Sequence, residues 1–131
     1  MKTIKICDKE YPVDCNAYTY VQFKKIFGTG IFEAVQKVQI FLQKQIVIKD
    51  AIMKDDPDIS QDKLEVIISN QMIDDIDDFF NSITKLAYIL IYTVNEEMLE
   101  YEKWLKTIDK MSIDDDWIVE VTELAVEKFC R

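Results

Sequence analysis

The sequence contains no histidine, only two glycines and two prolines, and no apolar run long enough to cross a lipid bilayer. Histidine general bases and histidine-ligated metal sites are therefore excluded. The scarcity of glycine and proline disfavours barrels and sandwiches, because such folds need many tight turns. The most apolar stretch, residues 86–94, is far shorter than the ~20 residues of a membrane-spanning helix. These absences predict a soluble protein.

Cysteine is also rare. Three cysteines, Cys7, Cys15 and Cys130, occur without a C-x-x-C spacing. An odd number in this arrangement is typical of a reducing compartment and not of a disulfide framework. The opening residues MKTIKICDKEY lack the apolar core of a signal peptide. We therefore expect a cytoplasmic protein.

Charge is unevenly distributed. The chain has 25 acidic and 16 basic residues, a net charge of −9, with +4 on residues 1–54 and −13 on residues 55–131. A net negative surface repels phosphates and anionic lipids, so neither a nucleic acid nor a membrane is an expected partner. The asymmetry is compatible with closure of one half of the chain on the other. It is also compatible with weak head-to-tail association into a homo-oligomer.

The length of 131 residues predicts one domain, residues 1–131, which begins with a β-hairpin over residues 1–15. Apolar residues alternate here in two short runs around the segment 8–10: Ile4, Ile6, Tyr11, Val13 and Cys15. If both runs face the same side of the hairpin, Cys7 points to the other face from Cys15, which disfavours a disulfide between them. Pro12 fits an edge strand, where a missing N–H is tolerated.

Residues 16–131 have helical periodicity, so the expected fold class is mainly α with a small N-terminal hairpin. Asn16 is a candidate N-cap for a short helix that ends at Gly28. Thr29 is the expected N-cap of the next helix, which covers about residues 31–54. The turn at residues 55–58 is expected to end this helix.

Helical spacing resumes at Ser60 or Asp62 and continues for about thirty residues to Val94, with a break allowed near Asn70 or Asn81. Residues 86–94 are apolar almost all round, which predicts the central helix. A shorter helix is expected over residues 98–108. The acidic residues 114–116 favour the start of a last helix.

The acidic clusters are the candidates for a metal site. An EF-hand calcium loop starting at Asp109 would place Met111, Ile113 and Asp114 at positions 3, 5 and 6. Positions 3 and 5 of such a loop need oxygen ligands and position 6 needs glycine, so the segment does not fit a calcium loop. Asp74 and Asp78 lie one helical turn apart, but such pairs are commoner on a solvated helix face. We therefore expect no metal and no cofactor.

No catalytic residues are predicted, because the chain has neither a phosphate-binding glycine loop nor an activated nucleophile motif. An enzyme is therefore not expected. The aromatic residues of the last third fit a hydrophobic core, yet tryptophan and tyrosine are also enriched as anchors of binding surfaces. The candidate partner-binding residues are Tyr88, Tyr92, Tyr101, Trp104, Leu105 and Trp117.

The order of these features resembles the tail assembly chaperones of long-tailed bacteriophages and prophage-derived tail particles. The matching motifs are TIKICDKEYPV, AYTYVQFKKIFG, LAYILIYTV, YEKWL and DDDWIVEVTELAVEKF. The resemblance covers the whole chain as architecture and residues 86–129 as local motif.

The resemblance implies a non-enzymatic protein of the host bacterial cytoplasm that is absent from the mature virion. Such proteins bind the helical tape-measure protein, and in some cases the tail-tube protein, until the tube polymerises. An alternative from another class is an acidic phage inhibitor that mimics DNA and blocks a host nucleic-acid-binding protein. The −13 charge of residues 55–131 favours this alternative, and the +4 charge of residues 1–54 disfavours it.

Overall fold

The N-terminal hairpin is present in the computed structural model, which describes residues 2–129. Strands β1 (Lys2–Ile6) and β2 (Lys9–Val13) pair antiparallel, with Ile6 opposite Lys9 and Ile4 opposite Tyr11. Cys7 and Asp8 form the two-residue turn with positive φ angles of 49° and 65°, the backbone of a type I′ hairpin. The alternating apolar side chains face the core as predicted, while Cys7 is exposed and Cys15 is buried.

Helix α1 (Ala17–Phe27) has the predicted boundaries. Asn16 Oδ1 accepts the N–H groups of Tyr18 and Thr19, and the Thr19 hydroxyl accepts the Asn16 N–H in return. Gly28 ends the helix at φ 77°, a left-handed conformation that glycine adopts without strain.

Helix α2 (Ile31–Asp55) also matches its predicted range. The prediction that Thr29 caps it is wrong. Gly30 is the N-cap residue, and no side chain makes a cap hydrogen bond.

The long helical segment is divided into α3 (Gln61–Gln71) and α4 (Ile73–Val94). Ser60 caps α3 by accepting the Lys63 N–H at 3.3 Å. Of the two starts that the sequence predicted, Ser60 and Asp62, the structure has Ser60 as the N-cap. The chain turns at Met72, two residues beyond Asn70, where a break was allowed. The Met72 side chain is 2% exposed, so burial of this residue holds the corner between the two helices.

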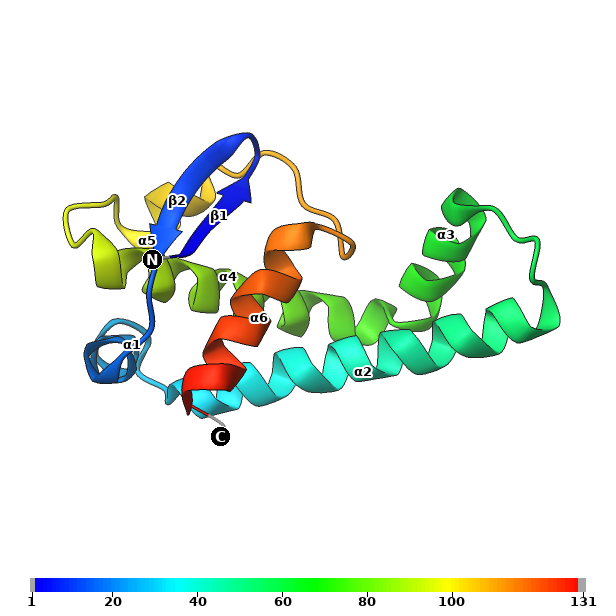
Figure 1. Cartoon of the computed structure of the whole chain (residues 1–131), viewed down its shortest axis with the longest axis horizontal. Helices are drawn as coiled ribbons and strands as arrows, with labels where there is room; N and C mark the ends of the chain where they lie inside the picture. The colour runs from blue at the N-terminus through cyan, green and yellow to red at the C-terminus, as the bar shows by residue number, and fades with distance from the viewer. Residues whose placement is uncertain (1, 130–131) are drawn as a thin grey trace.

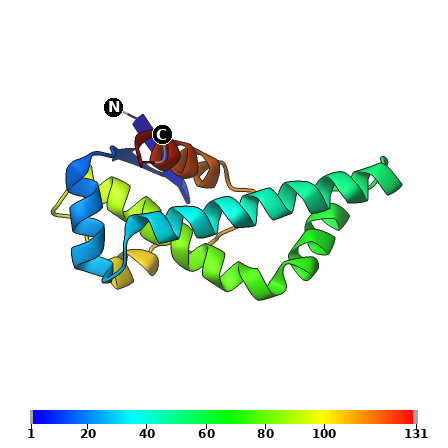
Figure 2. The ribbon, with the colours of Figure 1, turned by 90° about the horizontal axis from the view of Figure 1, so that it is seen from below.

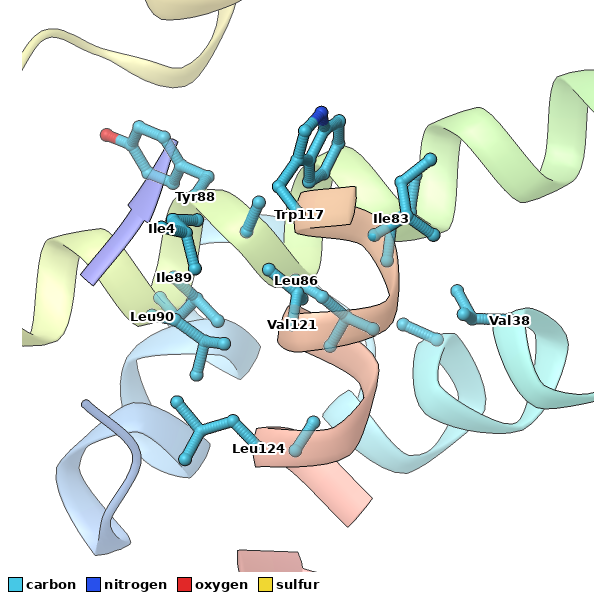
Figure 3. Close-up of a cluster of buried hydrophobic side chains, with 14 of the residues drawn as sticks. Ile4, Val38, Ile83, Leu86, Tyr88, Ile89, Leu90, Trp117, Val121 and Leu124 are labelled. Carbon is cyan, nitrogen blue, oxygen red and sulfur yellow. The ribbon is translucent and has the colours of Figure 1, made fainter. Parts of the chain in front are cut away.

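Helix α4 is the central helix, as predicted. It packs against α1, α2, α6 and β2, and Figures 1 and 2 show the hairpin and α6 together on one side of it. Figure 3 shows side chains from four elements meeting in this core, among them Ile4 of β1, Val38 of α2, Leu90 of α4 and Val121 of α6.

The last two helices differ in how well the sequence predicts them. Helix α5 spans only Tyr101–Leu105, so the predicted helix over 98–108 is too long. The Thr107 hydroxyl donates to the Trp104 carbonyl at 2.6 Å, where the helix ends. Helix α6 (Asp116–Phe129) begins within the predicted acidic cluster, and the Asp115 carboxylate accepts the Ser112 N–H at 2.9 Å just before it.

The second half of α2 and α3 extend away from the rest of the molecule, as Figures 1 and 2 show. We call residues 40–71 the α2–α3 arm and the remainder of the described chain the body. Among the helices of residues 2–129, none has the length and hydrophobicity needed to cross a membrane.

Candidate functional site

The predicted partner-binding residues lie mostly inside the body. Tyr88 and Trp104 retain 3% and 2% of their surface, and their ring centroids are 5.5 Å apart. Tyr101 completes this cluster at 5.4 Å from Tyr88 and 6.4 Å from Trp104. Tyr92 is half-buried at its edge, 6.0 Å from Tyr88 and stacked on Tyr18 at 6.5 Å. The structure therefore brings four of the six candidates together as a packed aromatic cluster.

Two tyrosine hydroxyls of this cluster are tied to the backbone or to another side chain. Tyr88 Oη donates to the Leu99 carbonyl at 2.8 Å, and Tyr101 Oη lies 2.8 Å from Thr84 Oγ1. Burial raises the pKa of Tyr88 and of Tyr101, and the Thr84 contact opposes the rise at Tyr101. Both rings are thus uncharged packing residues at neutral pH.

The remaining two candidates lie elsewhere. Leu105 is half-buried at the end of α5, and Trp117 is 3% exposed at the start of α6. Trp117 Nε1 donates to the Asp115 carboxylate at 3.3 Å. Because Tyr88, Trp104 and Trp117 are almost fully buried, their rings pack in the core, and only 2–3% of the surface of each residue is accessible to a partner. Partner binding by the six residues stays a prediction.

The acidic residues do not converge on an ion site within residues 2–129. No group of three or more histidine, cysteine, aspartate or glutamate side chains there is placed to hold a metal ion. Asp75, next to the candidate pair Asp74 and Asp78, makes an ion pair with Lys44 of α2 at 3.4 Å. This contact joins the start of α4 to the arm.

Five exposed apolar side chains lie on the arm, and the sequence pattern predicted no outward apolar stripe there. Each keeps between 41% and 65% of its surface: Ile40, Ile46, Val47, Met53 and Val66. Ile40 and Val47 are seven residues apart and share one side of α2, and with Gln43, Lys44 and Ile48 they line a shallow depression of about 280 Å³. A second, outward stripe on α2 could have been found from this heptad spacing.

Two ion pairs follow one edge of the outward stripe formed by Ile40 and Val47. Lys44 Nζ lies 3.4 Å from Asp75, and Lys37 Nζ lies 3.5 Å from Glu33. Where the arm meets the body, Gln45 Nε2 donates to the Asp114 carboxylate at 3.3 Å. A side-chain hydrogen bond with Asp114 raises the pKa of Glu65 on α3, and repulsion between the two carboxylates adds to the rise.

Comparison with known proteins adds no relative. The sequence matches no protein-family model and no curated protein, and the fold matches no solved structure.

Proposed function

We propose that this protein is a phage tail assembly chaperone that binds helices of the tape-measure protein and keeps them soluble until the tail tube polymerises around them. The observation that carries the proposal is the exposed apolar stripe on the α2–α3 arm, which no other described part of the chain covers. The resemblance of the sequence motifs to this family supports the same function.

A helix is the best-fitting occupant of the stripe. Ile40 and Val47 lie on one line along α2, and a second helix packs along such a line by inserting its own apolar residues between them. Lys37 and Lys44 follow one edge of the line, and each is paired with a carboxylate, Glu33 and Asp75 respectively. An amphipathic partner helix therefore complements the arm through its apolar face, with its polar flank next to an edge of balanced charge.

The proposal places the protein in the host bacterial cytoplasm before the tail is complete. It requires no cofactor, metal or catalytic residue, because sequestration of an apolar helix is a binding activity. The tail-tube protein is a secondary partner, since it must replace the chaperone on the tape measure as the tube grows.

Co-expression with the tape-measure protein of the same tail gene cluster tests the proposal. The wild-type protein should keep the tape measure in the soluble fraction and co-purify with it. The double variant I40E/V47E should lose this activity, because it places two charges on the stripe. Both positions are at least 47% exposed, so circular dichroism should show the wild-type helix content.

Val119→Glu is the matched control, because Val119 of α6 is 50% exposed and lies outside the arm. It should solubilise the tape measure like the wild type. If the wild-type protein neither binds nor solubilises any tape-measure fragment, the chaperone function is refuted. If it binds but I40E/V47E binds equally well, the arm is not the binding surface.

A further inference from the structure

The outer edge of β2 has backbone groups that the hairpin does not use. In a hairpin with a two-residue turn, Ile6–Lys9 and Ile4–Tyr11 are the pairs that exchange hydrogen bonds. The backbone groups of Glu10 and Pro12 therefore point away from β1. Asp14 continues the alternation, and its N–H donates outward to the Leu90 carbonyl at 3.2 Å.

Among residues 2–129, no hydrogen bond occupies the Glu10 N–H, the Glu10 carbonyl or the Pro12 carbonyl. Glu10 and Pro12 line a groove of about 370 Å³ between β2 and the segment 95–107, which we call the β2 groove. This volume lies within the range typical of ligand sites. Its apolar lining comes from both sides: Tyr11, Ile91, Met98, Leu99 and Trp104.

Trp104 supplies an independent observation at the same place. Its ring lines the β2 groove and is 2% exposed, yet its Nε1–H is buried without an acceptor among the described residues. Leaving a buried donor unpaired costs free energy, and native proteins contain few such groups. Because the Nε1 atom is itself not solvent-accessible, an oxygen acceptor of a bound segment removes this cost only when the indole shifts toward the groove.

We propose that the β2 groove binds an extended peptide segment of a partner protein, which adds a short antiparallel strand to β2. The Glu10 N–H and carbonyl pair with one residue of the segment, and the Pro12 carbonyl accepts the N–H of the residue two positions away. The residue between them lies opposite Tyr11, so its side chain points to the same face as the buried Tyr11 ring. An apolar side chain there lies over the floor of the groove.

The charges at the rim define the flanks of the segment. Two acidic residues, Glu10 and Glu97, are among the residues that line the groove, while Lys9 Nζ is held 5.4 Å from the centroid of the Tyr11 ring. A segment with basic residues on each side of its apolar residue complements this rim. The site goes beyond the proposed function, because it takes a strand and not a helix and lies apart from the arm (Figure 1).

The peptide acetyl-Thr-Lys-Leu-Lys-Thr-amide is the probe, titrated into ¹⁵N-labelled protein. Its leucine lies opposite Tyr11, and one of its lysines lies opposite Glu10. The chain has two tryptophans, so two indole N–H signals report on the two sites. The Trp104 signal should shift saturably while the Trp117 signal stays in place. A peptide with both lysine backbone nitrogens methylated cannot donate to the Glu10 and Pro12 carbonyls, and we expect it to bind at least tenfold more weakly.

Leu99→Lys provides the protein-side test, because Leu99 lines the groove and is 51% exposed, so its replacement should leave the fold intact. The lysine removes an apolar contact and repels the basic peptide, so this variant should bind the peptide at least tenfold more weakly. The matched control Val119→Lys and the arm variant I40E/V47E should bind it normally. A Trp104 signal that does not move at millimolar peptide would overturn the proposal. Equal binding of the methylated peptide, or equal binding by Leu99→Lys, would also overturn it. None of these outcomes depends on tape-measure binding.

Discussion

The hydroxyl oxygens of Thr19 and Thr93 lie 2.6 Å apart and join the start of α1 to the end of α4. The direction of this bond follows from its neighbours. Thr93 donates its hydroxyl proton to the Ile89 carbonyl at 2.7 Å, so Thr19 must be the donor to Thr93. Thr19 in turn accepts the Asn16 N–H at 3.1 Å, and its side chain is fully buried. One chain of hydrogen bonds therefore connects the N-terminal turn of α1 to the C-terminal turn of α4.

Replacement of Thr19 by valine should destabilise the protein by about 1–3 kcal/mol, because it leaves the Asn16 N–H and the Thr93 hydroxyl without this partner. Urea denaturation followed by circular dichroism measures the change. Thr19→Ser keeps the hydroxyl and should recover part of the loss. Equal stability of the valine variant and the wild type would show that the chain of hydrogen bonds contributes nothing.

Truncation of Ile6 to alanine tests the hairpin. Ile6 is 2% exposed in the core, so the loss should be about 2–5 kcal/mol of unfolding free energy. Thr3, exposed on the opposite face of β1, is the control, and its replacement by alanine should change stability by less than about 0.5 kcal/mol. Comparable melting temperatures for the Ile6 variant and the wild type would contradict the packing of β1.

The two described cysteines should differ in reactivity. Cys7 is exposed and its Sγ donates to the Lys110 carbonyl at 3.2 Å, whereas Cys15 is buried. Burial and the nearby Asp14 carboxylate raise the pKa of Cys15 to about 12, although Lys128 opposes the rise. Because thiolates are the reactive form, a thiol reagent at pH 8 should modify Cys7 rapidly and Cys15 only on unfolding.

Mass spectrometry of modified peptides distinguishes the two sites. A Cys130→Ser background removes the third thiol, which lies outside the described residues. Rapid modification of Cys15 in the folded protein would be incompatible with its buried position.

Glu65→Gln should raise the melting temperature at pH 7. The folded-state pKa of Glu65 is raised by Asp114, so the folded state binds this proton more tightly than the unfolded chain. The stabilisation is complete below the unfolded pKa of about 4.5 and is lost as pH rises through the folded pKa. At pH 7 the two carboxylates repel each other, and the glutamine removes that repulsion.

The gain should disappear below about pH 4, where Glu65 is protonated in both states. Asp62→Asn, one turn earlier in α3, is the control. It removes a favourable charge from the first turn and should not raise the melting temperature. A melting temperature of Glu65→Gln at or below that of the wild type at pH 7 would contradict the Glu65–Asp114 contact.

The sequence predicts those parts of the fold that depend on local chemistry. The alternation around Ile4 and Ile6, the cap at Asn16 and the left-handed Gly28 each act within a few residues, and the structure confirms all three. The turn at Met72 depends on how α3 and α4 pack, which no local pattern encodes. The prediction failed at Thr29 because threonine preference for N-caps is a tendency, and here Gly30 holds the cap position.

The candidate site was less predictable for a related reason. An aromatic residue has the same sequence signature in a core and at an interface, and only the three-dimensional packing shows that Trp104 and Trp117 are buried. The outward stripe at Ile40 and Val47 is the opposite case, because its spacing is visible in the sequence. It was obscured by the stronger stripe of Val35 and Val38 on the core side of the same helix.

Under the proposed function, the length of the α2 part of the arm would determine how many copies bind along one tape-measure helix. From Ile40 to its end at Asp55, α2 covers about 24 Å, the rise of about 16 helical residues. Arms laid end to end along a partner helix would therefore occupy about one copy per 16 residues. Under the proposed function, the stoichiometry of the complex should increase in proportion to tape-measure length, so phages with longer tails would need a larger supply of this protein for each particle.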